Sequence, residues 1–341
     1  MKRTGSTAGV IAIAAVGTAA LIGVPEFVET FTLVDVAVYC ILSVLALSLA
    51  FVWGYAGILS FGQSTFFGLG GYAYALTVIN LGESTVPIFA GIAVPMLFAA
   101  LLGYFMIYGR ISDVYLAVIT LTVSLIFYHL INSTSGPEYA VGRARLGGHN
   151  GIPGLPPINI PGDRTAQLDY ADTFRLSLAA LLLVYLGFRG LVASRFGRVL
   201  IAIRENELRA ELLGYDSRRY KLIAFTIGAG VAGFAGVLFA SWGSFIGPSV
   251  FGIAFAAQII IWILVGGLGT LGGAVVGTVL IQYLTTWLGQ TKALPAALGL
   301  SKIDPSLVLG IVLILFVLLV PSGLLPTLRK LFRARPPGAP S

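Results

Sequence analysis

The sequence has little of what soluble and metal-binding proteins carry. Of its 341 residues only 10% are charged, and it holds one cysteine and two histidines. A soluble domain carries about 25% charged residues, so a water-soluble fold is disfavoured. The lone Cys40 gives no disulfide framework, and His129 and His149 lack the spacing of metal ligands. We therefore expect neither a disulfide scaffold nor a metal site.

The motifs of catalysis and of ion coupling are also missing. There is no phosphate loop with its lysine, no H-E-x-x-H and no G-x-S-x-G. No paired carboxylates lie in an apolar run, and Asp35 lies close to the outer end of its span. Carriers driven by protons or sodium usually use such buried charges. If the chain takes part in transport, the energy must come from another subunit. An intramembrane enzyme and a passive channel remain the competing classes.

What the sequence does have is long apolar runs. Hydrophobic residues make up 57% of the chain, and the mean hydropathy is +0.94. The runs are continuous rather than alternating, which predicts an all-α bundle of transmembrane helices and not a barrel. Ten segments approach the ~20 residues that cross ~30 Å of hydrocarbon. They are 8–24, 31–52, 57–79, 86–108, 112–131, 175–193, 221–241, 251–266, 271–289 and 305–325.

These segments predict one transmembrane domain over 1–341. Its first half is 8–131, its second half is 175–325, and the loop 132–174 joins them. The first segment resembles a signal peptide, but we expect an uncleaved span because a poor cleavage site follows it. The tail 326–341 is basic and expected to be disordered.

The basic residues predict orientation. A net charge of +7 would suit nucleic acid, but the lysines and arginines flank the apolar spans, so we expect membrane lipid and no nucleic acid as a partner. Both termini and the stretch 189–220 are placed in the cytoplasm, and the loop 132–174 on the other side. That loop carries three arginines, which is tolerable because long loops translocate largely regardless of charge. A bacterial inner membrane is the expected location.

The longest charged stretch, 195–220, has apolar residues at helical spacing. The pattern predicts one short amphipathic helix, ended at Gly214 by a left-handed residue. A solvated helix between two spans and a docking helix are equally compatible with this spacing. The apolar positions are Val199, Leu200, Ile203, Leu208, Leu212 and Leu213.

The stretch 53–76 is broken by six glycines and carries polar side chains among them. Small residues permit close helix packing, and that alone explains Gly68 to Gly71. It does not explain polar side chains at membrane depth, which need a partner or a water-filled cavity. We therefore favour a broken helix that lines a transport path. The residues assigned to the path here are Ser60, Gln63, Ser64, Thr65 and Tyr72.

A second glycine-broken stretch, 257–287, adds Gln258 and Thr270 to the predicted path. It is not a phosphate loop, because no lysine and hydroxyl follow its glycines. The two broken segments are third and eighth of ten, so they run in opposite directions. This predicts an inverted pseudo-repeat whose broken helices meet near the membrane midplane.

These stretches resemble one known family. GRVLIAIRENELRAELLGYDSRRYKLIAF, WGYAGILSFGQSTFFGLGG and VGGLGTLGGAVVG are similar to elements of LivM-type permeases, and GGHNGIPGL to a Gly-rich element of the same family. Those permeases are membrane subunits of ABC importers for branched-chain amino acids, with urea and short-amide permeases as relatives. The resemblance covers about 50–330. It implies an all-α permease with a pseudo-twofold bundle.

The resemblance also implies partners. The chain would pair with a second, homologous permease subunit, two ATPase subunits and a soluble substrate-binding protein. ATP and Mg²⁺ would bind the ATPase subunits, which would carry out hydrolysis, with no cofactor and no enzymatic activity in this chain. The substrate would be a branched-chain or other small amino acid, with urea or a short amide as the alternative. The 132–174 loop is either a cap that meets the binding protein or a plain external loop.

In that family the charged stretch is a coupling helix that fits a cleft of the ATPase. Ala210 and Gly214 match the wider importer pattern, whereas Leu208 and Arg209 stand where Glu and Ala are usual. The residues assigned to coupling are Arg204, Glu205, Asn206, Glu207, Arg209, Ala210, Glu211 and Gly214.

Overall fold

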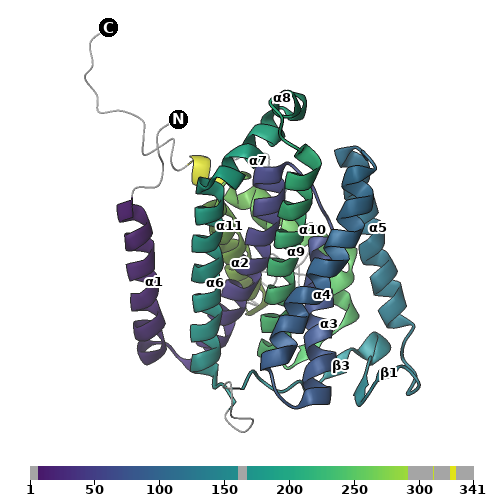
Figure 1. Cartoon of the computed structure of the whole chain (residues 1–341). Helices are drawn as coiled ribbons and strands as arrows, with labels where there is room; N and C mark the ends of the chain where they lie inside the picture. The colour runs from purple at the N-terminus through teal and green to yellow at the C-terminus, as the bar shows by residue number, and fades with distance from the viewer. Residues whose placement is uncertain (1–6, 160–166, 291–309, 311–322, 328–341) are drawn as a thin grey trace, which may run out of the picture.

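The computed structural model describes residues 7–159, 167–290, 310 and 323–327, and within them the chain folds as a bundle of helices (Figure 1). The expected segment 305–325 and the tail 326–341 lie almost wholly outside the described residues. The long helices are α1 (Thr7–Phe27), α2 (Thr30–Ala56), α3 (Gln63–Leu81), α4 (Thr85–Gly103), α5 (Asp113–Asn132), α6 (Tyr170–Ala193), α9 (Ser217–Trp242), α10 (Ile253–Gly266) and α11 (Leu271–Gln290).

Shorter elements connect these helices. A π-helix, Tyr104–Tyr108, extends α4, and α7 (Arg195–Glu205) and α8 (Glu207–Leu212) lie between α6 and α9. At the other end, β1 (Ala140–Val141) pairs with β2 (Ala144–Arg145), and β3 (Ile152–Pro153) pairs with β4 (Phe245–Ile246), both antiparallel. Short 3-10 turns cover Gly148–Asn150 and Pro248–Phe251. An all-α membrane bundle is therefore confirmed.

The count of separate crossings differs from the expected ten. Within the described residues, five helices are long and apolar enough to cross a membrane, and α10 with α11 makes a sixth only as a pair bent by 116°. The 14 residues of α10 span about 21 Å, short of the ~30 Å of hydrocarbon. The expected crossing 251–266 is therefore wrong as a full span. The expected span 57–79 is wrong in its first turns, because residues 57–62 are not helical.

Glycines let α3 and α9 approach each other at backbone distance. A methyl group on Gly70 would overlap the backbone of Gly233, and one on Gly236 would overlap the carbonyl oxygen of Phe67. Such contacts favour helix association in a membrane, where apolar burial gives little driving force. Close packing thus accounts for Gly70 and its neighbour Gly71.

The loop after α5 folds back onto the helix ends. The Ile158 N–H donates to Ser241 Oγ at 3.0 Å, and the Ser84 N–H donates to Asn159 Oδ1 at 2.7 Å. Ile152 pairs with Ile246 in the β3–β4 ladder, and Leu155 is buried. The described part of this loop is therefore packed against the ends of α4 and α9.

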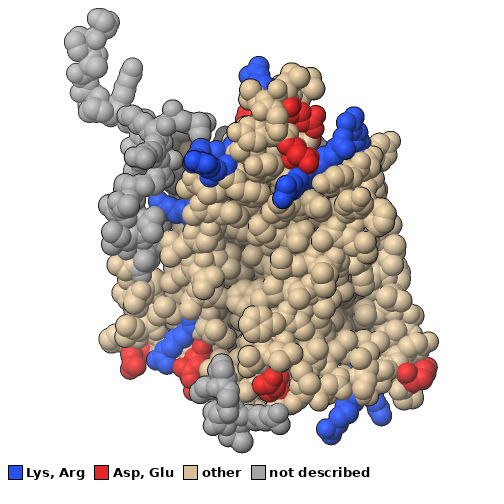
Figure 2. Space-filling view, viewed as in Figure 1, with Lys and Arg blue, Asp and Glu red and all other residues tan. Residues whose placement is uncertain are grey.

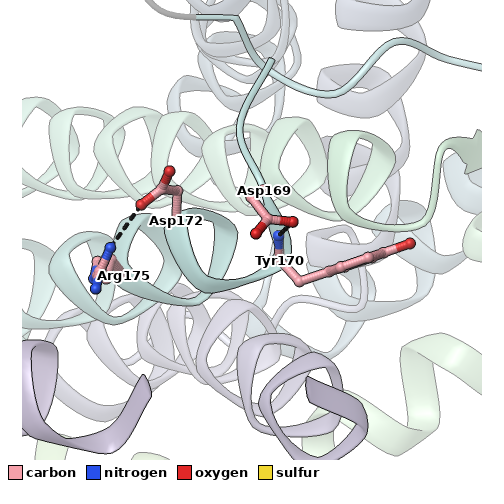
Figure 3. A network of polar contacts seen from close by, with 4 residues as sticks. All are labelled: Asp169, Tyr170, Asp172 and Arg175. Carbon is pink, nitrogen blue, oxygen red and sulfur yellow. Dashed lines mark hydrogen bonds and ion pairs between the residues drawn. The ribbon is translucent and has the colours of Figure 1, made fainter. Parts of the chain in front are cut away.

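The start of α6 is fixed by side chains at the same end (Figure 3). The Tyr170 N–H donates to Asp169 Oδ1 at 2.7 Å, so Asp169 caps the helix. Arg175 and Asp172 form an ion pair at 2.8 Å one turn further on. These contacts lie at the water-exposed rim of the bundle and set where α6 begins.

Charged residues gather at the two ends of the molecule. On the face in Figure 2, Lys, Arg, Asp and Glu lie at both ends, and the surface between them carries none. α7 and α8 stand at the end opposite β1 and β3 (Figure 1). The stretch 195–220 and the described parts of the loop, 132–159 and 167–174, therefore lie at opposite ends, as the sequence predicted. An uncharged belt between charged ends is the surface of a protein that crosses a bilayer.

Candidate functional site

The first glycine break carries the chain back into the bundle. α2 ends at Ala56, and Gly57 has a left-handed φ of 76° that turns the chain. α3 begins at Gln63, whose Oε1 accepts a hydrogen bond from Ser48 Oγ at 3.2 Å. Ser48 lies eight residues before the end of α2 (56 − 48), or about 12 Å along the helix. α3 therefore begins inside the bundle and not at its surface.

The polar side chains at the start of α3 bind α5. Thr65 Oγ1 lies 2.5 Å from Ser124 Oγ, and Ser64 Oγ lies 3.3 Å from the same oxygen. The Phe61 N–H donates to Thr120 Oγ1 at 3.1 Å. Ser124 is eleven residues into α5 (124 − 113), or about 16 Å along that helix, so α5 also places the break well inside the bundle.

These contacts give most of the predicted polar residues a structural partner. Ser60 Oγ accepts from the Gly62 N–H at 3.0 Å, and Ser64 and Thr65 bind Ser124. Sequence reasoning missed Thr120 and Ser124. Their signal was a pair of hydroxyls four residues apart, on one face of an otherwise apolar segment.

Three buried polar atoms have no hydrogen-bond partner in the described part of the chain. They are Gln63 Nε2, Tyr72 Oη and Trp262 Nε1. Gln63 is 1% exposed, so its amide is closed to solvent in this conformation. Buried polar groups are nearly always hydrogen-bonded, because leaving one unpaired costs roughly 1–3 kcal/mol. Of the predicted path residues, Gln63 and Tyr72 thus have a donor free for a bound molecule.

The second glycine break lies between α10 and α11. Gly267 and Gly269 have φ of 112° and 82°, and Thr270 Oγ1 donates to the Gly267 carbonyl at 2.9 Å. Gln258 is half-buried on α10. Within the described residues, no hydrogen bond links Gln258 or Thr270 to Gln63. The predicted path residues therefore do not form one polar cluster here.

The backbones of the two breaks nevertheless touch. A Cβ on Gly54, in the last turn of α2, would lie 3.2 Å from the Cα and N of Gly269. The Arg204 guanidinium of α7 donates to the Gly54 carbonyl. Phe67 of α3 packs against Phe255 of α10 with ring centroids 5.3 Å apart. The two broken segments, although far apart in the sequence, thus meet beside the charged stretch.

The charged stretch is two helices and not the single helix predicted. Asn206 takes extended angles, φ −159° and ψ 101°, and breaks the helix. Its Oδ1 accepts from the Arg209 N–H at 2.8 Å, so Asn206 is the N-cap of α8. Asparagine favours this position because its side chain replaces a missing backbone acceptor.

The break at Asn206 separates two apolar faces. Leu200 and Ile203 of α7 are buried in the bundle. By contrast Leu208, Leu212 and Leu213 are 68%, 81% and 72% exposed. α8 projects from the end of the molecule in Figure 1. We call these three leucines the α8 leucine patch; it has no cover in the described part of the chain.

α8 is held to the start of α9. Gly214 has φ 89°, and its N–H donates to the Glu211 carbonyl at 2.9 Å, so the predicted left-handed stop is confirmed. Glu207 binds Lys221 at 2.6 Å, and Ser217 Oγ donates to Glu211 Oε1 at 2.5 Å. Ala210 is buried, whereas Glu205 and Arg209 are exposed.

The pKa of Glu207 reflects these contacts. Partial burial raises it, but the hydrogen bond and the charge of Lys221, together with the charge of Arg218, outweigh burial. The net effect lowers the pKa below its usual value, so Glu207 is ionised at neutral pH.

The fold and this geometry define a helical membrane protein with two broken segments in contact beneath a projecting charged element. Broken helices of this kind mark the substrate sites of membrane transporters. The family model described as branched-chain amino acid transport system, permease component, matches residues 32–320. The chain therefore belongs to this permease family of ABC importers.

Individual proteins with similar sequences point to the same family. The high-affinity branched-chain amino acid transport system permease protein LivM of Escherichia coli is 31% identical over 323 residues, covering 87% of this chain and 70% of LivM. A probable LivM of Methanocaldococcus jannaschii is 26% identical over 332 residues, covering 83% of this chain and 90% of that protein. The LivH permease of Salmonella typhimurium is 33% identical over 132 residues, covering 39% of this chain and 40% of LivH. No solved structure matches the chain.

These comparisons confirm the resemblance read from the sequence. The relatives are transport permease subunits, so the chain is a transport subunit and not an enzyme. The urea or short-amide alternative is not favoured, because the matching family is that of branched-chain amino acids. The roles of individual residues in the path and in coupling stay predictions, as do the inverted pseudo-repeat and the division into halves.

Proposed function

We propose that the chain forms the substrate path of an ATP-driven importer of branched-chain amino acids. The relatives LivM and LivH are named as permeases of such systems, which supports this substrate class. The observation that carries the proposal is the start of α3, which lies inside the bundle and carries the unpaired Nε2 of Gln63.

The start of α3 suits the carboxylate of an amino acid. A helix N-terminus has free N–H groups and a partial positive charge, which stabilise a bound anion. Gln63 Nε2 adds a donor at the same place. The buried Phe66 and Phe67 follow directly and offer an apolar surface for a branched side chain.

The path must open for the substrate to enter. Gln63 and Ser64 are buried in this conformation, so a bound amino acid requires a rearrangement around the break. Gln258 and Thr270 lie on the other broken segment and join the path when the two segments separate. This is alternating access around a fixed site.

ATPase subunits would drive that rearrangement through α8. The α8 leucine patch offers apolar area, and the neighbouring Arg209 and Glu205 offer charges, which together suit a groove on a partner subunit. ATP and Mg²⁺ would bind there and not on this chain. A second, homologous permease subunit would complete the membrane part, since the relatives include both LivM and LivH.

The remaining assignments follow from charge and topology. The α7–α8 end faces the cytoplasm with both termini, and the packed 133–159 loop faces the opposite side, where a soluble substrate-binding protein docks. The membrane is the bacterial inner membrane.

Uptake by whole cells tests the substrate class. Cells that lack their own branched-chain importers receive this chain with its partner subunits, and uptake of labelled leucine is measured with excess isoleucine, valine or urea. We expect leucine uptake that isoleucine and valine inhibit and urea does not. Uptake inhibited by urea alone, or no leucine uptake from a complex present in the membrane, would overturn the proposal.

A further inference from the structure

Three helix ends meet at the side chain of Arg204. The residue lies in the last turn of α7, and its guanidinium donates to the carbonyl of Gly54 in the last turn of α2. A Cβ on Gly269, three residues past the end of α10, would lie 3.8 Å from Arg204 Nη1. The C-terminal ends of helices carry partial negative charge, so a cation at this point is stabilised by several dipoles together.

The Gly54 carbonyl has no donor in its own helix. A regular helix would give it the N–H of Ile58, but that N–H donates to the Val52 carbonyl instead, because the chain turns at Gly57. Arg204 therefore satisfies an acceptor that the break leaves open.

The surface under the arginine is bare backbone. A Cβ on Gly57 would lie 3.1 Å from Arg204 Cγ, and Gly57 and Gly269 both have positive φ. A side chain at Gly57 would press on the stem of Arg204, and one at Gly269 would stand in van der Waals contact with its guanidinium. The glycines at the two breaks thus leave room for the Arg204 side chain and also turn the chain.

Arg204 is also tied to the projecting end of the molecule. It lies two residues before Asn206, where α7 gives way to α8. Leu200 and Ile203 bury α7 in the bundle, so the last turn of α7 connects the projecting α8 to the helix ends that meet at Arg204.

We propose that Arg204 is a positioning residue that holds the two broken segments together and transmits a displacement of α7–α8 to both at once. Its transmitting role in transport rests on the proposed function, whereas the contacts by which it joins the two breaks do not. The sequence assigned Arg204 to ATPase coupling; here the residue is exposed, and its guanidinium donates to the Gly54 carbonyl beside the first break.

Hydrogen exchange on the purified full chain in lipid nanodiscs tests the hold, with no substrate or partner needed. Arg204→Gln removes the cation, and Gly54→Val puts a side chain between the two breaks while it keeps the arginine. Arg198→Gln is the matched control, because Arg198 lies on the same helix and donates to the Ala193 carbonyl at 2.8 Å, away from both breaks.

We expect exchange in 57–62 and in 267–270 to rise about tenfold in Arg204→Gln and in Gly54→Val, while the rest of the bundle and the Arg198→Gln chain exchange as wild type. No change, a change at one break alone, or the same change in Arg198→Gln would overturn the proposal.

The second arm measures coupling in the complete reconstituted importer. ATP hydrolysed per leucine transported should rise in Arg204→Gln and stay at the wild-type value in Arg198→Gln, a ratio that a merely structural loss of folded complex leaves unchanged. A wild-type ratio in Arg204→Gln would overturn the transmitting role even if the exchange result holds. A wild-type complex that moves no leucine would instead count against the proposed function, and the exchange arm would still decide whether Arg204 holds the breaks.

Discussion

Thr65 and Ser124 place their hydroxyl oxygens 2.5 Å apart, although 59 residues separate them in the sequence. Thr65 lies in the first turn of α3, and Ser124 lies in the middle of α5. Their contact is one of those that keep the start of α3 at depth in the bundle, where a helix end is unusual. The position of Gln63, and with it the proposed path, depends on this contact.

Removing the Ser124 hydroxyl should destabilise the bundle. Ser124→Ala leaves the buried Thr65 hydroxyl without its partner, and hydrogen bonds inside membrane bundles are worth about 1 kcal/mol. We expect a lower melting temperature for the purified chain in detergent. Thr122→Val is the control, because the exposed Thr122 donates to the Val118 carbonyl of its own helix. Equal melting temperatures for both variants would contradict the structural role of Ser124.

The α3–α9 contact should not tolerate a methyl group. In Gly70→Ala the new methyl overlaps the backbone of Gly233, and overpacking of this kind costs about 1–3 kcal/mol. Gly187→Ala on α6 meets nothing within 4 Å and should be neutral or stabilising. Thermal unfolding of the two variants side by side measures the difference. A Gly70→Ala chain as stable as Gly187→Ala would show that the two helices do not touch there.

Charge on the α8 leucine patch should release the ATPase subunits. Leu212 is 81% exposed, so Leu212→Asp leaves the fold and the melting temperature of the isolated chain unchanged. We expect it to reduce the amount of ATPase subunit that copurifies by roughly tenfold, since an apolar anchor at an interface contributes about 1–2 kcal/mol. Tyr139→Asp, an exposed apolar residue at the other end, serves as control. Normal copurification with Leu212→Asp would refute docking through this patch.

The end of α8 should require glycine. Gly214 has φ 89° and open space around it, so Gly214→Val is penalised by backbone strain alone, about 1 kcal/mol or more. Gly214→Asn should retain more coupling, because asparagine tolerates left-handed angles. Stimulation of ATP hydrolysis by substrate, measured on assembled complexes, should fall in the order glycine, asparagine, valine. The reverse order for the two variants would contradict the role of the left-handed stop.

Cysteine labelling tests the orientation. Cys40 is buried and the only cysteine of the sequence, so Cys40→Ala gives a background without reactive thiols. In that background Tyr139→Cys should react with a membrane-impermeant reagent from outside the cytoplasm, and Tyr215→Cys only from inside. Both positions are exposed at opposite ends. Labelling of both cysteines from the same side would contradict the predicted orientation.

The sequence predicted what depends on local pattern. Continuous apolar runs gave the helical bundle, and a glycine after a periodic stretch gave the left-handed end at Gly214. It could not predict the break at Asn206, since Leu208 and Leu212 continue the helical spacing and only packing shows that their face leaves the bundle. Nor could it predict that 57–62 turns back into the bundle. That depth depends on Thr120 and Ser124, which are distant in sequence and look like ordinary hydroxyls of a span.

ATP-driven leucine uptake into proteoliposomes that contain the complete importer tests the central claim most directly. Gln63→Leu removes the unpaired amide nitrogen at the start of α3, whereas Thr77→Val removes a hydroxyl of the same helix that donates to the Ala73 carbonyl. We expect uptake to fall roughly tenfold or more in Gln63→Leu, the loss for a hydrogen bond to a charged group, and to remain near wild type in Thr77→Val. Gln63→Leu vesicles that accumulate leucine at the wild-type rate would contradict a substrate path at this break.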